Sequence, residues 1–418
     1  MKINPYKVLS ELAFERLAGS DNERKAAEII TSHIESLGLK VVNDKFEIHC
    51  FDTGTGSLTV DGRDYEVVPF GLSNEVEIEA EMIFLENPDI LLHNKKMYKG
   101  KIVLSYGYSR KIQESIQNQE LAAFIAIGSP ARKAPSWSHR QKSYVDGTFV
   151  GATVSYDDAT KISKFDGKVV KLSIKQSASK REAANLIVDI AGSEPDGNLT
   201  YLVAHYDSVA RTEGASDNLG GTVSLIKIAE HFAAKRPKRD LRIIFFSGEE
   251  MGLLGSQHYV KSNEEEVKTR GSLVMNIDVT GDPIGQNRVI VTGTPELLGY
   301  TDGITKEKGH CLHHSLDIYS SDQMPFTKFE LPGLSIARFG GKGSFYIHTP
   351  DDNRKNVSPA GLKQPIEAAT LILDRILNAD IYPVKREIDN SLREKIEKYF
   401  WNLNFEEPKL EWTPKYKL

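Results

Sequence analysis

Seven side chains with metal-binding or acid–base chemistry follow the ends of apolar runs in the second half of the chain. His205 and Asp207 come directly after the run YLVA, and Asp278 follows LVMNI. Asp217 lies in a Gly-rich loop, and the pair Glu249 and Glu250 follows the run RIIFFSG. His348 follows the run FYI. Because ligands bind outside the carboxyl ends of the strands in open α/β sheets, we expect these side chains to meet at one site.

The types of these side chains predict a metal centre. Imidazoles and carboxylates without a thiolate suit zinc, cobalt or manganese, and they argue against a calcium-only or iron–sulfur site. A shared aspartate can bridge two ions about 3.5–4 Å apart, as two-metal hydrolases need. Asp207 lies two residues from His205, so we expect it to orient that imidazole through the second ring nitrogen. Glu249 is then left beside the metal-activated water, where a general base belongs.

Apolar runs and helical periodicity alternate from Asn185 onward, and they predict the elements that position these residues. Buried strands are expected at Leu186–Ile190, Thr200–Ala204, Leu241–Phe246, Leu273–Ile277, Val289–Val291 and Leu334–Ala337. Helices are expected at Leu219–Ala234, Leu254–Asn263, Glu296–Lys308 and Ala360–Asn378. Strands that alternate with helices indicate an α/β fold with a doubly wound sheet, mostly parallel or mixed.

A strand-rich segment precedes this α/β pattern. Between Phe51 and Lys180 short alternating runs are separated by turn signals such as Asp61-Gly62. One helix is expected at Lys111–Leu121, and the basic loop Ala131–Lys142 is expected to be a solvated excursion. These features predict a separate β-rich module of about 130 residues, inserted into the α/β domain.

The opening residues belong to the α/β domain in this interpretation. Ser20 and Asp21 supply N-cap oxygens for a helix that Gly38 ends, and a strand is expected at Lys40–Ile48. A charged helix is expected at Arg386–Tyr399, followed by a polar tail. We therefore predict a catalytic domain of residues 1–48 and 181–380, an insert of residues 49–180, and a C-terminal helix and tail of residues 381–418.

Composition excludes several classes of protein. The chain has 418 residues, of which 40% are hydrophobic and 27% charged, the proportions of a globular protein. Its formal net charge of −5 argues against a nucleic-acid partner. Two distant cysteines, Cys50 and Cys311, suit neither a disulfide framework nor a cysteine zinc cluster. The first twenty residues lack the apolar core of a signal peptide, and no window is long enough to span a membrane, so we expect a cytoplasmic protein without a membrane partner.

The motifs around the seven side chains resemble metallopeptidase family 28, the co-catalytic di-zinc aminopeptidases. The strings that carry the resemblance are HYDS, SDN, FFSGEEMGLLGS, NIDVTGD, SDQMPF and HTPDD. The resemblance implies a zinc-exopeptidase-like fold, two zinc ions, peptide substrates and cleavage at a free N-terminus. It implies one ion held by His205, Asp217 and Asp278, and a second held by Asp217, Glu250 and His348. Glu249 would be the base and Asp207 the orienting acid.

Two further points follow from the same comparison of motifs. The insert, with GKIVLSYG, AAFIAIG and GATVSYDDATKI, is similar to a protease-associated domain. Several relatives carry a tyrosine directly before the last histidine, whose hydroxyl helps to hold the oxyanion. Here Ile347 occupies that position and the tyrosine is Tyr346. If the segment is extended, positions 346 and 348 point to the same side, so Tyr346 can still reach the site.

Other functions remain open at this point. A carboxypeptidase or dipeptidase, a one-zinc glutaminyl cyclase and a metal-free binding protein can share the fold that the resemblance implies, and metal content separates the last two from a di-zinc enzyme. Assembly into a homo-oligomer also stays open. The chain contains no HExxH, GxSxG or GxxxxGK[ST] motif. A local cluster of histidines, His310, His313 and His314, is expected to lie in a solvated loop.

Overall fold

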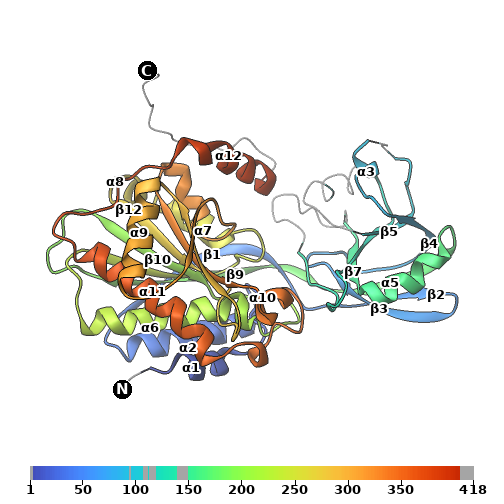
Figure 1. Cartoon of the computed structure of the whole chain (residues 1–418). Coiled ribbons are helices and arrows are strands. Elements are labelled where there is room, and N and C mark those ends of the chain that lie inside the picture. The colour runs from blue at the N-terminus through green and yellow to red at the C-terminus, as the bar shows by residue number, and fades with distance from the viewer. Residues whose placement is uncertain (1–2, 94–95, 107–111, 113–118, 139–148, 405–418) are drawn as a thin grey trace.

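The computed structural model of the chain describes residues 3–93, 96–106, 112, 119–138 and 149–404. Figure 1 shows a large α/β body and a smaller β barrel, joined by a pair of long strands. None of the described helices combines the length and the apolar character that a membrane span needs.

A mixed sheet runs through the body. In the described part of the chain its order is β1 (Val41–Phe51), β9 (Ala178–Ile190), β11 (Asp240–Phe246), β10 (Leu199–His205), β12 (Gly271–Ile277), β15 (Gly333–Phe339), β13 (Gln286–Thr292) and β14 (His313–Leu316). The central strands β11, β10, β12 and β15 are parallel, whereas β9 and β13 run antiparallel to their central neighbours. The predicted α/β fold with a mixed sheet is therefore confirmed.

Helices cover both faces of this sheet. One face carries α1 (Pro5–Leu12), α2 (Asp21–Glu35), α6 (Gly220–Ala234), α9 (Pro295–Glu307) and α11 (Pro359–Leu377), whose apolar sides share one core with the strands. The other face carries α7 (Leu254–Ser262), α8 (Glu264–Thr269) and the 3₁₀ turn η4 (Met324–Phe329). Because the central strands are buried on both faces, their sequences are apolar without polar alternation.

The helices near the two ends of the chain were predicted only in part. The predicted cap of α2 is present, because the Ser20 side chain accepts a hydrogen bond from the Glu23 backbone N–H. The short helix α1 was not predicted, although Asn4 caps it in the same way. The last helix, α12 (Asn390–Asn404), begins later than the predicted Arg386 and packs its apolar side against Leu253 and Met324.

The barrel closes upon itself and has its own core. Its strand order is β2 (Thr55–Val60), β3 (Arg63–Pro69), β7 (Gly151–Val154), β6 (Ala123–Ile127), β5 (Ile102–Tyr106), β4 (Val76–Leu85) and β8 (Val169–Lys175). The helices α3 (Ile90–His93) and α5 (Tyr156–Ile162) and the 3₁₀ turn η2 (Ser163–Phe165) complete the described part of this module. Alternate side chains such as Leu58, Leu104 and Ile125 are fully buried inside it. Most of the predicted helix Lys111–Leu121 lies outside the described residues.

The connection between barrel and body is a single antiparallel ladder. β1 pairs with β9 from Val41↔Val188 to Phe51↔Ala178, so the pairing continues beyond the predicted limits of the insert at residues 49 and 180. Independent folding of residues 49–180 stays a prediction. Two predicted loops differ from expectation: His313 and His314 begin the edge strand β14, and residues 132–137 contact the body.

Candidate metal centre

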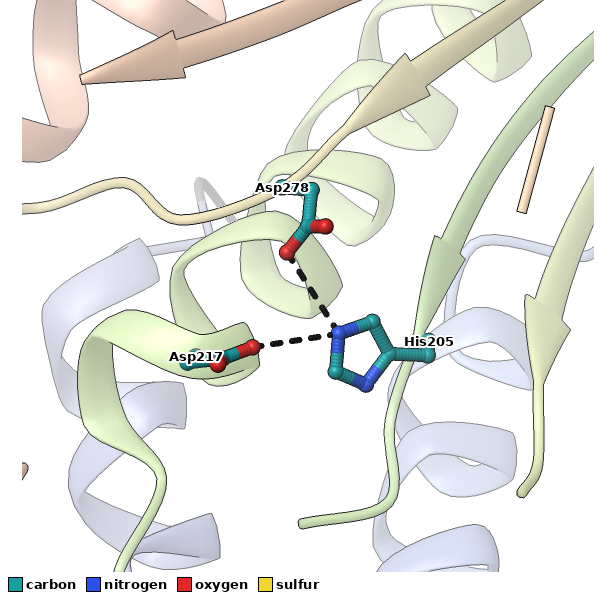
Figure 2. Close-up of side chains that lie close together, drawn as sticks. All are labelled: His205, Asp217 and Asp278. Atoms are coloured by element: carbon teal, nitrogen blue, oxygen red, sulfur yellow. Dashed lines mark ion pairs between the residues drawn. The ribbon is translucent and has the colours of Figure 1, made fainter. Parts of the chain in front are cut away.

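Three of the predicted ligands meet at the carboxyl end of the sheet. His205 is the last residue of β10, Asp278 directly follows β12, and Asp217 lies in the turn η3 (Ala215–Leu219) that leads into α6. The His205 Nε2 atom is 3.2 Å from Oδ1 of Asp217 and 3.4 Å from Oδ1 of Asp278. Figure 2 shows both carboxylates directed at the same ring nitrogen.

A second group of ligands shares Asp217. The His348 Nε2 atom is 3.3 Å from Oδ2 of Asp217 and 3.1 Å from Oε2 of Glu250. In each trio the possible ligand atoms lie within 4.8 Å of one another. The two oxygens of Asp217 therefore face different histidines, one in each trio.

Glycines bring the Asp217 turn close to the strand ends. A Cβ atom on Gly221 would lie 2.2 Å from the Ile277 carbonyl oxygen and 2.4 Å from Oδ1 of Asn218. Only glycine leaves room for the start of α6 at this distance from the end of β12. Because Asp278 follows Ile277 directly, this close packing sets Asp217 and Asp278 side by side.

Asp207 ties the end of β10 to the segment after β11. Its Oδ1 and Oδ2 atoms accept hydrogen bonds from the backbone N–H groups of Glu249 at 3.2 Å and Glu250 at 3.3 Å. Its Oδ1 atom is also 3.5 Å from Nδ1 of His205. Gly248 has a φ of +69°, which lets the chain turn sharply before the two glutamates. One buried carboxylate thus holds the Glu249–Glu250 backbone and faces the ring nitrogen that is turned away from Asp217.

Several buried acidic side chains surround the two imidazole rings of the centre and change their pKa values. Burial alone would lower the pKa of His205, but Asp207, Asp217 and Asp278 outweigh it and hold that pKa well above the usual value. The pKa of His348 is likewise held well above the usual value, because Glu250 and Asp217 outweigh burial.

The carboxylates of the centre are perturbed in opposite directions. Burial would raise the pKa of Asp217, but His205 and His348 outweigh it and lower that pKa. Burial raises the pKa of Glu249 and of Glu250, and neighbouring acids add to the effect. Such strongly perturbed groups at the mouth of a sheet are typical of a functional site.

The donor atoms fit metal ions. Nε2 of His205, Oε1 of Glu250 and Oδ1 of Asp278 are buried without a hydrogen-bond partner among the described residues. Buried polar atoms of this kind are costly unless something binds them. Imidazole nitrogens and carboxylate oxygens are ligands for zinc, and each trio is short of the four ligands that closed zinc sites have. The centre can therefore hold zinc and keep positions open for substrate.

Tyr346 does not lie in an extended segment, so that premise of its predicted role is wrong. It is the last residue of the short helix α10 (Lys342–Tyr346), and the chain turns at His348, which has a φ of +62°. The Tyr346 carbonyl accepts hydrogen bonds from the backbone N–H and the hydroxyl of Thr349. Its role at the oxyanion stays a prediction.

Two polar groups near the centre were missed by sequence reasoning. Asp352 is fully buried and accepts hydrogen bonds from the backbone N–H groups of Ser216 at 2.8 Å and Asp217 at 3.0 Å. Burial raises the pKa of the Tyr319 phenol, and the charges of Asp278 and Asp217 raise it further, so this phenol lies within their electrostatic reach. Asp352 stands in the quoted string HTPDD, whereas Tyr319 has no motif of its own.

A known family matches the part of the chain that carries the centre. Residues 185–372 match the family described as Peptidase family M28, and this stretch includes every proposed metal ligand. This stretch is therefore similar to the M28 peptidases. The predicted class of enzyme, a metallopeptidase, is therefore confirmed, whereas the role of each side chain stays a prediction.

Individual relatives resemble this chain over different lengths. Aminopeptidase YwaD from Bacillus subtilis is 27% identical over 397 residues, which cover 87% of this chain and 81% of the relative. Human carboxypeptidase Q is 27% identical over 293 residues, which cover 63% of this chain and 61% of the relative. The solved structure of BSAP, a zinc aminopeptidase from Bacillus subtilis, has a TM-score of 0.75 at 22% identity, with 92% of this chain and 98% of that chain covered. This structural likeness confirms the fold.

Proposed function

We propose that this chain is a di-zinc aminopeptidase that hydrolyses peptides at a free N-terminus. The observation that carries the proposal is the position of Asp217, whose Oδ1 and Oδ2 atoms face His205 and His348 respectively. A carboxylate shared in this way suits a bridge between two metal ions. The names of YwaD, an aminopeptidase, and BSAP, a zinc aminopeptidase, support the proposal.

The proposed ligands divide into two trios. One ion would bind to His205, Asp217 and Asp278, and the other to Asp217, Glu250 and His348. Zinc suits these donors best, and cobalt or manganese could replace it. When bound, a pair of dications supplies the Lewis acidity that polarises a peptide carbonyl and lowers the pKa of water.

Glu249 would move the proton in the proposed reaction. Its pKa is raised by burial and by its acidic neighbours, which brings a carboxyl group toward the range where it can both accept and donate a proton. It would accept a proton from water and pass it to the leaving amine. Asp207, which holds the backbone of Glu249, would keep that carboxylate in place and orient the His205 ring.

The preference for a free N-terminus follows the names of YwaD, an aminopeptidase, and BSAP, a zinc aminopeptidase. The similarity to carboxypeptidase Q keeps carboxypeptidase or dipeptidase activity as the second candidate.

The barrel is part of the same proposal. Its closed strand order and its position between β1 and β9 support the hypothesis of a protease-associated domain, as the motifs of residues 49–180 suggest.

The test combines metal analysis with a substrate panel. We expect two zinc ions per purified chain, hydrolysis of aminoacyl nitroanilides, and no hydrolysis of the same peptides after N-terminal acetylation. One ion together with cyclisation of N-terminal glutamine would instead indicate a glutaminyl cyclase, and cleavage of acetylated peptides from the other end a carboxypeptidase. Asp217→Asn should lower the affinity for both ions, and wild-type binding of both would overturn the bridging role.

A further inference from the structure

The loop between β6 and β7 of the barrel reaches the segment that carries His348. The Ser136 backbone N–H donates a hydrogen bond of 2.8 Å to the His348 carbonyl oxygen. The Arg132 guanidinium donates to the carbonyl oxygen of Ile347, the preceding residue. The barrel, rather than the domain that supplies the ligand, thus binds the backbone carbonyl of a proposed metal ligand and the carbonyl of the residue before it.

Trp137, in the same loop, lies against the ring of His348. The two ring centroids are 5.3 Å apart and the ring planes meet at 85°, an edge-to-face contact. Nevertheless, 36% of Trp137 is exposed, a large fraction for a large aromatic side chain. One part of the indole therefore packs on the ring of a proposed metal ligand, and another part is exposed.

The centre opens toward solvent on this side. The His348 side chain is 24% exposed, whereas the side chains of Asp217 and the other proposed ligands are at most 7% exposed. A substrate that enters from solvent must then pass His348. Because Trp137 lies against that ring and is itself partly exposed, it borders the same entrance.

A second exposed aromatic side chain lies next to this entrance. Phe345, on α10, is 48% exposed, and the Arg132 guanidinium stacks over its ring at 5.6 Å. Exposed aromatic groups beside a polar centre are typical of a surface that binds an apolar part of a ligand.

We propose that Trp137 is a specificity-determining residue, by which the barrel contacts an apolar side chain of the peptide next to the scissile bond. This inference rests on the proposed peptidase function and deepens it. The apolar side chain belongs either to the N-terminal residue or to the residue after it, and a test can distinguish the two.

The first experiment compares large and small residues on each side of the bond. We expect Trp137→Ala to lower kcat/KM by roughly 10-fold or more for substrates with leucine in the contacted position, mainly through KM. Substrates with glycine there should change by about 2-fold or less. Leucyl and glycyl nitroanilides vary the first residue, and Leu-Leu-amide and Leu-Gly-amide vary the second. Trp137→Phe should keep most of the preference, because it keeps an aromatic face.

Tyr156→Ala is a matched control. Tyr156 is also a barrel aromatic and is 37% exposed, but its ring packs edge-on against Tyr106 at 6.3 Å. The control should keep the wild-type preference. If Trp137→Ala kept the wild-type ratio of leucine to glycine substrates on both sides of the bond, the inference would be overturned, even if its zinc affinity or its overall rate fell. If the wild-type protein cleaved no peptide, the proposed function would fail instead.

A binding measurement tests the same contact without catalysis. L-Leucine, a product of the proposed reaction, should change the intrinsic tryptophan fluorescence of the zinc-loaded protein, and glycine should not. The change should vanish in Trp137→Phe and persist in Trp401→Phe, which removes an exposed tryptophan of α12. A leucine-dependent change that survives in Trp137→Phe would overturn the proposal.

Discussion

Asp352 accepts a hydrogen bond of 3.0 Å from the backbone N–H of Asp217, so one buried acid fixes the backbone of another. Its second oxygen accepts the N–H of Ser216 at 2.8 Å. Asp352 comes four residues after His348, and its carboxylate therefore links the segment of one proposed ligand to the turn that carries the shared one. The precise placement of Asp217 depends on this link as well as on the sheet.

Asp352→Asn should weaken zinc binding at both sites. An amide has a single acceptor oxygen, so one of the two buried N–H groups would lose its partner, at a cost of about 1–3 kcal/mol. Loss of a group that orients a ligand typically lowers metal affinity by about 10–100-fold. Titration with a zinc chelator measures the effect. Asp351→Asn is the control, because Asp351 pairs with Lys133 at the surface, and equal losses in both variants would contradict the assignment.

Glu249 and Glu250 should respond differently to the same substitution. Glu249→Gln removes the proposed base but keeps its size, so we expect kcat to fall by about 10²–10⁴-fold with two ions still bound. Glu250→Gln removes a proposed ligand 3.1 Å from His348 Nε2, so one ion should be lost together with activity. Metal content and kcat of the two purified variants decide the matter. The same metal loss in both, or an active Glu249→Gln, would require the two roles to be exchanged or abandoned.

Tyr319 is a second candidate, beside Tyr346, for stabilising the oxyanion, and we expect it to have the larger effect. Burial raises the pKa of the Tyr319 phenol, and the charges of Asp278, Asp217 and Glu249 raise it further, so the phenol lies within their electrostatic reach. Loss of one hydrogen-bond donor to an oxyanion costs about 10²–10³-fold in kcat, and we expect this loss in Tyr319→Phe. Tyr346→Phe should have a smaller effect. Parallel measurements of kcat and KM compare the two, and the reverse order of effects would refute the expectation.

Glu23 should make stability depend on pH. Its carboxyl accepts hydrogen bonds from the Gly19 backbone N–H and from the Ser247 hydroxyl, and burial raises its pKa from the usual 4.5 to about 8. Because the folded state binds the proton more tightly, this stabilisation is complete below pH 4.5 and is lost as the pH rises through about 8. The neutral variant Glu23→Gln should therefore lose less Tm than the wild type between about pH 5 and about pH 9.

The exposed Glu28 of the same helix provides the control for this titration. Glu28→Gln should keep the wild-type dependence of Tm on pH. Thermal unfolding of the zinc-loaded proteins measures all three chains under the same conditions. Identical pH profiles for Glu23→Gln and wild type would show that Glu23 titrates normally.

The strand ends explain why much of the centre could be predicted. His205 and Asp278 follow apolar runs that become adjacent parallel strands, and parallel strands deliver their ends to one edge of the sheet. By contrast, the function of Asp352 depends on backbone N–H groups more than a hundred residues away, which no local pattern reveals. Tyr346 was misjudged because three residues that read as the end of a strand, FYI, span the end of a helical turn instead.

The contacts that the barrel makes with the metal centre could not be predicted from the local sequence either. The basic residues Arg132 and Lys133 are typical of a solvated loop, and only the packing of two modules shows that they contact Ile347 and Asp351. The contact of Trp137 with His348 arises in the same way. Contacts between parts of a chain that fold around separate cores leave no periodicity in either part.

The ladder of β1 and β9 has a consequence for the order of folding. Phe51 and Ala178 are partners although about 130 residues separate them, and closing a loop of that length costs about 4 kcal/mol of chain entropy. The neighbouring pair Thr55↔Lys175 belongs to the barrel, so a barrel that folds first has already brought these ends together. We expect the barrel to nucleate the ladder, which then extends toward Val41. In pulsed hydrogen exchange during refolding, the amides of β2 and β8 should be protected before those at the far end of β1.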